Sequence, residues 1–446
     1  MSRFKLAFKK FISNKRESRA WRSSIWILGG FGASQILRLG GNLILTRFLA
    51  PEAFGLMALV YGVLKGLELF SDTGIRSAII HHERGDENAF LNTAWTIQVV
   101  RGFVLWGVAV MLAWPMSLAF GQPLLVPLLT IVGITAVFYA LRSVMYFVHN
   151  RRLEMRRLMV FEFFAQVVGL TTMIVWASIY PSIWALAGGA VVGTAIRAGL
   201  SHAMLGPHRH RLMYEKSAGR DLFRFGKWIF VSSSVTFVIG QADRFVVGGL
   251  TDMTTLGLFS IAMTLAMVVQ VSANAVINRV LFPIFSRVYR TDGRELLRNR
   301  MRRTSFILYA FSLPVLLMFV AGGEALVQLL YDPRYASAGG MLKIIATGLI
   351  GMMVTNVAAA GLLATGDSRS QAIMQGIRLA TFGIATAIGV AMGDLVAFLV
   401  AMACARWIDY FPAAMLLRRA GLWNPSVDIP ILIISALSIV LIFQWA

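Results

Sequence analysis

Residues 89–113 read AFLNTAWTIQVVRGFVLWGVAVMLA, an apolar run of 25 residues with one charged side chain, Arg101. A run of about 20 apolar residues is long enough for a helix to cross the hydrocarbon core of a bilayer. The rest of the chain is similar, because 57% of its 446 residues are hydrophobic and only 14% are charged. A soluble globular chain has about 25% charged residues. The composition therefore predicts a membrane protein.

Apolar runs of comparable length recur along the whole chain and predict thirteen transmembrane helices, within a range of twelve to fourteen. Most joins between the runs are short, so consecutive helices are expected to lie antiparallel. A membrane barrel needs short alternating segments rather than long apolar runs, so the expected fold is an all-α polytopic membrane protein. The expected spans are 23–46, 54–80, 89–113, 123–147, 158–179, 182–206, 228–250, 256–284, 304–322, 338–364, 371–392, 395–417 and 428–445.

The basic residues predict how the chain is oriented in the membrane. With residues 1–22 in the cytoplasm, the loops on that side carry 29 Lys and Arg, whereas the opposite loops carry only Arg47 and Arg334. Basic loops face the cytoplasm, so the amino terminus is expected on the cytoplasmic side of the membrane. The net charge of +21 is then a topology signal and an attraction to anionic lipids rather than a sign of nucleic-acid binding. Residues 4–12 (FKLAFKKFI) fit an amphipathic helix on the inner leaflet, or a disordered basic tail.

Two stretches about 200 residues apart resemble each other and suggest an internal repeat. In 48-FLAPEAFGLMALVYGVL-64 and 249-GLTDMTTLGLFSIAMTL-265, Gly55-Leu56 matches Gly257-Leu258. Because the offset spans six helices, the two copies would have the same orientation, as in several transporter folds. The repeat predicts two six-helix lobes around a central cavity. The expected parts are a basic amphipathic segment (1–22), an amino-terminal lobe (23–206), a basic linker (207–227), a carboxy-terminal lobe (228–417) and one additional helix (418–446).

Charged side chains inside the expected spans need a physical reason, because each costs about 2.5–3.5 kcal/mol at the bilayer centre on insertion scales. Arg38, Lys65, Arg101 and Arg406 lie deepest, roughly 15 Å from either end of their spans at 1.5 Å per residue. A polar cavity between the helices would explain them. Other bases lie near span ends, where long side chains can snorkel to the interface: Arg76, Arg142, Arg244, Arg279 and Lys343.

The excess of bases favours an anionic ligand for this cavity, and phosphate is the usual one. Gln35 and Asn42 lie on the same expected helix as Arg38 and are candidates to extend the lining. Acidic residues could pair with the bases or couple transport to an ion. Glu68 and Asp409 follow Lys65 and Arg406 by three residues, a spacing that places each pair on one helical face. Two further acidic candidates are Asp72 and Asp243.

Several function classes are excluded by what the sequence lacks. Cys404 is the sole cysteine, and all six histidines fall at the expected cytoplasmic face, so no metal site is expected. There is no Gly-rich phosphate loop, so ATP hydrolysis is not expected. The outward loops leave no room for a catalytic domain. We therefore expect a protein that is not an enzyme and holds no cofactor.

Ordered motifs then give a family resemblance. The chain resembles the polysaccharide transporter branch of the multidrug/oligosaccharidyl-lipid/polysaccharide exporter superfamily. The matching stretches, in the family's order, are 47-RFLAPEAFGLMAL-59, 71-SDTGIRSAII-80, 242-ADRFVVGGLTDMTTLGLFSIA-262, 280-VLFPIFSRV-288, 326-LVQLLYDPRYASAGGMLKIIA-346 and 364-ATGD-367.

The resemblance implies a flippase that moves lipid-linked oligosaccharides outward across the bacterial inner membrane by alternating access. The expected substrate is an anionic polyprenyl-(pyro)phosphate-linked oligosaccharide, and partners would include the polymerase and glycosyltransferases of the same surface polysaccharide pathway. One alternative is a cation-coupled drug or small-molecule antiporter of the same superfamily. Another is a membrane glycosyltransferase or polymerase.

Overall fold

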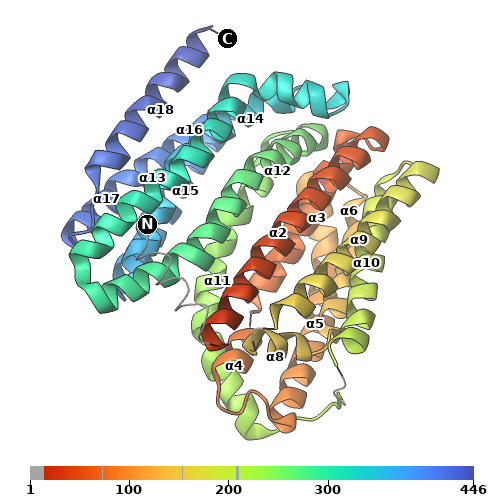
Figure 1. Ribbon diagram of the computed structural model, residues 1–446. Helices are drawn as coiled ribbons and strands as arrows, with labels where there is room; N and C mark the ends of the chain where they lie inside the picture. The colour runs from red at the N-terminus through yellow and green to blue at the C-terminus, as the bar shows by residue number, and fades with distance from the viewer. Residues whose placement is uncertain (1–14, 73, 153, 207–209, 446) are drawn as a thin grey trace. The chain divides into compact units, whose positions relative to one another are not determined.

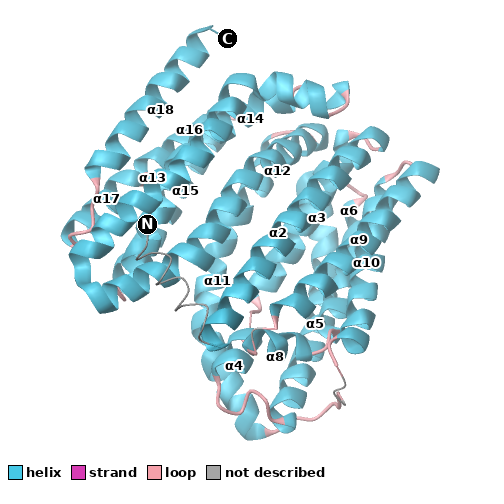
Figure 2. Cartoon of the chain, in the orientation of Figure 1, coloured by secondary structure: helices cyan, strands magenta, loops and turns pink. Residues whose placement is uncertain are grey.

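The computed structural model describes residues 15–72, 74–152, 154–206 and 210–445, and every regular element in them is helical (Figures 1 and 2). The expected amphipathic segment 4–12 lies outside these residues. In chain order the helices are α2 (Lys15–Phe48), α3 (Pro51–Phe70), α4 (Ile75–His81), α5 (Asn88–Phe120), α6 (Leu125–Gly133), α7 (Thr135–Leu141), α8 (Met145–Arg151), α9 (Met155–Ile179), α10 (Ile183–Met204), α11 (Lys216–Leu250), α12 (Met253–Val276), η1 (Ile277–Leu281, π-helix), α13 (Phe282–Leu330), η2 (Pro333–Tyr335, 3₁₀), α14 (Ala338–Ala364), α15 (Ser368–Met392), α16 (Leu395–Ile408), α17 (Tyr410–Arg419) and α18 (Pro425–Trp445).

All thirteen expected spans fall on these helices, but three of them are interrupted. The interrupted spans are 54–80, 123–147 and 395–417. In the described part of the chain, eight helical segments are long and apolar enough to cross a membrane, or up to nine if the bent segment from α6 to α8 is one span. The count of thirteen stays a prediction. The helix expected from residue 228 begins twelve residues earlier, at Lys216, inside the expected linker.

The chain forms two compact units. Unit 1 comprises Met1–Leu49 and Leu59–Phe237, and unit 2 comprises Ala50–Ala58 and Val238–Ala446. The lobe boundaries expected from the sequence remain a proposal.

In unit 1, α9 packs against α2 and α10 through glycines. A Cβ at Gly41 of α2 would lie 2.3 Å from Leu170, and the Cα of Gly193 on α10 would lie 3.1 Å from a Cβ at Gly169. The side chain of Gln166 donates a hydrogen bond to the carbonyl oxygen of Ser34 (3.0 Å). Small residues let helix backbones approach closely in membrane proteins, where lipid provides no hydrophobic drive for association.

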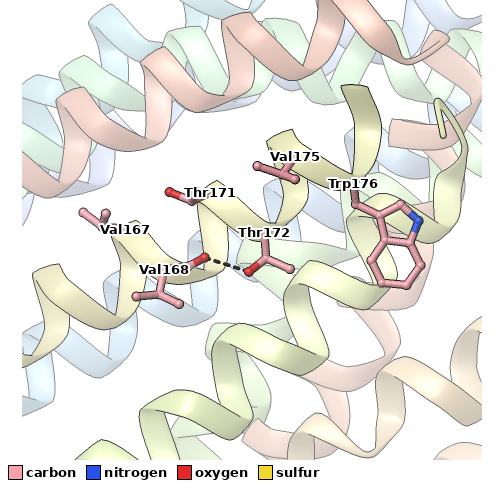
Figure 3. Close-up of a pocket in the computed structure, with 6 residues that line it drawn as sticks. All are labelled: Val167, Val168, Thr171, Thr172, Val175 and Trp176. Atoms are coloured by element: carbon pink, nitrogen blue, oxygen red, sulfur yellow. Dashed lines mark hydrogen bonds between the residues drawn. The ribbon is translucent and has the colours of Figure 1, made fainter. Parts of the chain in front are cut away.

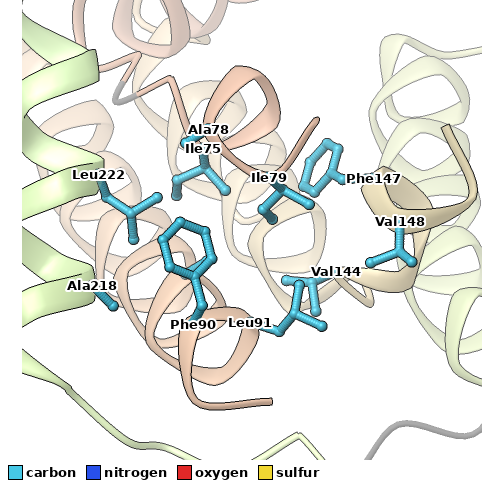
Figure 4. Close-up of a cluster of buried hydrophobic side chains, with 11 residues drawn as sticks. Ile75, Ala78, Ile79, Phe90, Leu91, Val144, Phe147, Val148, Ala218 and Leu222 are labelled. Atoms are coloured by element: carbon cyan, nitrogen blue, oxygen red, sulfur yellow. The ribbon is translucent and has the colours of Figure 1, made fainter. Parts of the chain in front are cut away.

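One end of unit 1 has its own apolar core, where α4, α5, α8 and α11 meet (Figure 4). Its largest members are Phe90 and Phe147, and Ile79 and Leu222 pack with them. This core holds two short helices, α4 and α8, in place. Neither has enough turns to be stable in isolation, so packing must fix both of them.

The segment that precedes α11 is docked on α5 by backbone hydrogen bonds. The amide of Met213 donates to the Thr96 hydroxyl (3.0 Å), and the amide of Glu215 donates to the Thr93 hydroxyl (3.1 Å). The Arg84 guanidinium donates to the Glu215 carboxylate (2.8 Å). Residues 211–217 of the expected linker are therefore fixed to unit 1.

Acidification is expected to release this docked segment. Hydrogen bonds from the Ser217 hydroxyl and the Arg84 guanidinium hold the pKa of Glu215 below its ordinary value of 4.5. The pKa of Glu215 is lower in the folded protein than in the unfolded chain. The stabilisation is therefore present at a pH above the ordinary pKa and is lost as the pH falls through the pKa of the folded state. Hydrogen-exchange protection of the Met213 and Glu215 amides should therefore persist above the ordinary value of 4.5 and fall as the pH is lowered below it. Glu215→Gln should remove this pH dependence, and protection that does not change with pH in the wild type would contradict it.

In unit 2, the first turns of α3 and α12 touch through backbone atoms. A Cβ at Gly55 would lie 2.0 Å from the carbonyl oxygen of Met253, and a Cβ at Gly257 would lie 1.9 Å from that of Pro51. Gly55 and Gly257 are the two glycines that the repeat expected from the sequence would place in register. Only glycine permits this separation, because at both positions the obstacle is main chain. The centre of unit 2 is α14, and most of its residues are buried.

Candidate functional site

The first interruption separates α3 from α4 at Ser71–Gly74. Gly74 has φ 67°, a left-handed conformation that strains other residues, and it ends the helical path. The Asp72 carboxylate accepts a hydrogen bond from the Gly74 amide (2.9 Å) and one from the Ser233 hydroxyl (3.4 Å). Asp72 thus stabilises the turn, and it is held by α11.

Arg101 closes the carboxy-terminal end of α3. Its Nε donates to the Ser71 hydroxyl (2.9 Å), and its Nη2 donates to the carbonyl oxygen of Glu68 (2.6 Å). The last carbonyls of a helix have no partner within the helix and carry partial negative charge. A guanidinium at this position satisfies them while keeping further N–H groups for a ligand.

Lys65 and Glu68 form an ion pair with 2.7 Å between Nζ and Oε2, which confirms the pairing expected from their spacing. Both side chains remain more than 40% exposed. The structure therefore brings Lys65, Glu68 and Arg101 together around the end of α3, with Asp72 in the adjoining turn.

The second interruption lies between α7 and α8, which are bent by 57° at Arg142–Val144. Neighbouring side chains satisfy the backbone groups that the bend frees. Gln98 donates to the carbonyl oxygen of Ala140 (2.7 Å), and the Ser143 amide donates to the Ser201 hydroxyl (2.8 Å). Non-helical backbone at membrane depth is tolerated where protein groups replace the lost bonds, and such broken helices commonly form substrate sites in transporters.

Arg142 does not snorkel, so the expectation for this residue is wrong. It is 4% exposed, and its guanidinium lies 4.0 Å from the Tyr146 ring centroid and 4.6 Å from that of Tyr139. Its Nη1 is 3.3 Å from Oε1 of Glu162. The bend turns the side chain into the helix bundle, where aromatic faces and a carboxylate replace water. Lys343 pairs with Glu324 (2.9 Å), whose side chain is 55% exposed, so the snorkelling expected for Lys343 stays a prediction.

Among the described residues, no hydrogen bond or ion pair joins Gln35 or Arg38 of α2 to this group. Gln35 is buried, and its Nε2 has no hydrogen-bond partner there. Arg38 lies one turn further along α2 and is exposed, whereas Asn42 is partly buried. Their role in ligand binding remains a proposal.

Unit 2 holds a separate charge network at the remaining candidates. The Asp243 carboxylate accepts a hydrogen bond from the Arg244 amide (2.9 Å), and Arg406 lies within electrostatic range of both Asp243 and Asp409. Asp243 and Arg406 line a cavity of ≈ 20 Å³, which is room for about one water molecule.

Asp409 completes the network with Arg378, a base inside the expected span 371–392 that was not among the site candidates. Arg378 Nε is 4.0 Å from Oδ2 of Asp409, and Arg378 Nη2 donates to the Thr355 hydroxyl (2.7 Å). The pairing expected between Asp409 and Arg406 is present as an electrostatic interaction, whereas the closer contact of Asp409 is a hydrogen bond from the Thr381 hydroxyl (2.9 Å). Because Arg244 also lies within electrostatic range of Asp243, the network holds three arginines and two aspartates.

A groove of ≈ 480 Å³ runs along α9 in unit 1 (Figure 3). The Thr172 hydroxyl is used in a hydrogen bond to the carbonyl oxygen of Val168 (2.9 Å). The groove carries no charge and therefore suits an apolar chain rather than a phosphate. Its lining residues are Val167, Val168, Thr171, Thr172, Val175 and Trp176.

Comparisons with known proteins agree with this architecture. The profile of a family described as "Polysaccharide biosynthesis protein" matches residues 44–339. The chain is 23% identical over 304 residues to the lipopolysaccharide biosynthesis protein WzxC of Escherichia coli (strain K12), covering 68% of this chain and 61% of that protein. It is 22% identical over 303 residues to the succinoglycan biosynthesis transport protein ExoT of Rhizobium meliloti (strain 1021), covering 68% and 60%. The aligned part spans about three-fifths of the length of these relatives.

Solved structures show the fold. The lipid II flippase MurJ in an inward closed conformation matches with a TM-score of 0.75 and 13% identity over 93% of this chain and 91% of that chain. A multidrug resistance MATE family transporter in an inward-facing conformation matches with a TM-score of 0.68 and 12% identity over 87% and 95%. The chain has the helical membrane-transporter fold of these proteins, which confirms the expected fold class.

Proposed function

The chain belongs to the polysaccharide biosynthesis protein family, and from this premise we propose that it is a flippase for an anionic polyprenyl-(pyro)phosphate-linked oligosaccharide. It would act in the bacterial inner membrane by alternating access, with its amino terminus in the cytoplasm, and would serve surface polysaccharide assembly. This is a transport function rather than an enzymatic one.

The observation that carries the proposal is the group of bases at the broken helix in unit 1. Arg101 and Lys65 lie beside the interruption between α3 and α4, and the Lys65 side chain is 43% exposed. A guanidinium with spare N–H groups and an accessible ammonium are suited to a phosphate or pyrophosphate. We propose that Arg38 on α2 adds to this set and that Gln35 and Asn42 contact the glycan.

The acidic candidates are assigned to charge balance. Glu68 pairs with Lys65, and Asp243 and Asp409 both lie within electrostatic range of Arg406 in unit 2. Arg406 is therefore proposed as part of a structural network, with the substrate contacts in unit 1. The negative head group would gain about 2.3 kcal/mol per charge for each 100 mV on leaving an inside-negative cell, which offers a driving force without a coupled ion.

Deleting the gene from its native bacterium tests the proposal. Cells without the protein should lose surface polysaccharide and accumulate undecaprenyl-linked oligosaccharide, which can be measured in lipid extracts, and a plasmid copy should restore both. Intact polysaccharide together with new sensitivity to cationic dyes would contradict the proposal and favour a drug antiporter. Loss of polysaccharide with no accumulated lipid-linked oligosaccharide would favour an enzyme of the pathway.

A further inference from the structure

Two arginines share one carboxylate beside the second broken helix of unit 1. Glu162 on α9 lies 3.3 Å from Nη1 of Arg142 through one oxygen and 3.4 Å from Nε of Arg197 through the other. The side chains of Glu162 and Arg197 are each about a quarter exposed, whereas that of Arg142 is 5% exposed. The three residues carry a net positive charge inside the bundle.

The carboxylate does not satisfy the two guanidinium groups. The Nε atoms of Arg142 and Arg197 are both buried, and neither makes a hydrogen bond to any described residue. The 3.4 Å contact between Arg197 Nε and Glu162 is an ion pair without a hydrogen bond. A buried N–H group without a partner costs about 1–3 kcal/mol, more when it belongs to a charged group. A tetrahedral phosphate, with three or four acceptor oxygens, could satisfy more of these donors than a planar carboxylate can.

Aromatic and basic neighbours extend this group toward the first broken helix. The Tyr139 hydroxyl accepts a hydrogen bond from Nη2 of Arg142 (3.3 Å), and Tyr139 also lies within electrostatic range of Arg101. Tyr146 lies within range of Arg76, which is exposed. Both interruptions in unit 1 therefore carry an arginine, and Tyr139 lies between them.

We propose that Arg142 and Arg197 form a second binding site for a lipid-borne phosphate group, in which Glu162 occupies the place of that group until it binds. The inference rests on the proposed function, because it adds a site for the same class of substrate to that at Arg101. Binding of the phosphate would displace the Glu162 carboxylate toward its exposed side, and the charge of the two arginines would be balanced by the ligand instead.

Thermal unfolding of the full chain in phosphatidylcholine nanodiscs tests the site, with undecaprenyl phosphate as the probe. Glu162→Gln should unfold at a lower temperature than the wild type without the probe, because two arginines lose their counter-ion. It should nevertheless bind the probe roughly tenfold more tightly, because no carboxylate competes with the phosphate. A purely structural Glu162 would give the lower unfolding temperature without the gain in affinity, and that result would overturn the proposal.

Two further variants keep the test decisive. Arg197→Gln should bind the probe roughly tenfold more weakly than the wild type. If Glu162→Gln does not fold, Arg197→Gln is sufficient for the test. Unchanged affinity in Arg197→Gln would overturn the site. Glu87→Gln removes an exposed carboxylate of unit 1 that pairs with Arg84 (2.7 Å) and should leave affinity unchanged. Equal loss of affinity in Glu87→Gln and Arg197→Gln would also overturn it.

A second probe identifies the lipid that carries the phosphate, and the Arg101→Ala variant distinguishes a failure of this site from a failure of the proposed function. Phosphatidylglycerol serves as a second probe. If the protein binds it more weakly than undecaprenyl phosphate, the ligand is the polyprenyl lipid, and if it binds both equally, the ligand is a phospholipid head group. Tighter binding of either probe by Glu162→Gln than by the wild type supports the site. Binding of undecaprenyl phosphate that is lost in Arg101→Ala but unchanged in both Glu162→Gln and Arg197→Gln would overturn this site alone. A wild-type protein that does not bind undecaprenyl phosphate would contradict the proposed function.

Discussion

Replacing Arg101 by alanine is expected to abolish polysaccharide export while the protein stays in the membrane. The substitution removes the hydrogen bonds to the Glu68 carbonyl and the Ser71 hydroxyl and also removes the positive charge beside the helix break. Each hydrogen bond to a charged group contributes about 1.5–3 kcal/mol. If about 3 kcal/mol of this falls on substrate binding, export should drop roughly a hundredfold. Surface polysaccharide in a complemented deletion strain measures the effect, with immunoblotting of membranes for protein level.

Companion variants separate the charge from the geometry. Arg101→Lys keeps the charge but lacks the planar fork that reaches two acceptors, so an intermediate loss is expected. Arg300→Ala alters an exposed arginine of α13 and should export normally. Arg38→Ala and Lys65→Ala should each lower export as well. Normal polysaccharide in Arg38→Ala, Lys65→Ala and Arg101→Ala alike would refute the assignment of these bases.

A valine at position 257 is expected to prevent stable folding. Its Cβ would lie 1.9 Å from the carbonyl oxygen of Pro51, so α3 and α12 would have to separate at their first turns. Overpacking of a well-packed contact costs about 1–3 kcal/mol where side chains can adjust. Here the obstacle is backbone, so we expect a loss of more than about 4 kcal/mol, the range of exceptional single substitutions.

Size-exclusion chromatography of detergent extracts after heating measures this loss directly. Gly257→Val should give little monodisperse protein at any temperature, and Gly55→Ala should lower the unfolding temperature for the same reason. Gly376→Ala is the matched control, because no atom lies within 4 Å of its Cβ position on α15. Alanine is favoured over glycine in a helix by about 1 kcal/mol, so this control should be as stable as the wild type or more stable. A stable Gly257→Val protein would show that the two helices do not need this contact.

Helix positions could be predicted from the sequence because long apolar runs leave the backbone no other way to satisfy its hydrogen bonds in lipid. The breaks within them were harder to predict. Ser71–Gly74 contains the turn signal Asp-x-Gly, which could have been recognised within the span 54–80. The bend after Leu141 has no glycine or proline, and it exists because Gln98 and Ser201 satisfy the freed backbone groups. That support comes from residues 42 or more positions away, beyond the reach of local pattern.

In the candidate site, too, contacts within one helix could be predicted, whereas contacts between helices could not. Lys65 and Glu68 share a continuous helix, so their spacing sufficed to predict the ion pair. The partners of Arg101 are a hydroxyl and a carbonyl oxygen on another helix, and those of Arg142 are aromatic rings and Glu162. Arg101 was selected because it lies deep in its expected span. Arg142 lies near the end of its expected span, and for this reason it was expected to reach the membrane interface. The direction of a side chain follows from the bend in its backbone, and the sequence does not reveal that bend.

The contact between Gly55 and Gly257 also limits how the protein can evolve. When a larger residue clashes with a side chain, a second mutation can shorten that neighbour and restore fitness. At these two positions the clash is with carbonyl oxygens, which every amino acid retains, so no compensating substitution nearby can make room. Suppressor screens started from a mutant at Gly55 or Gly257 should therefore recover only reversion to glycine. Neither position can accept a larger residue with the help of a second substitution.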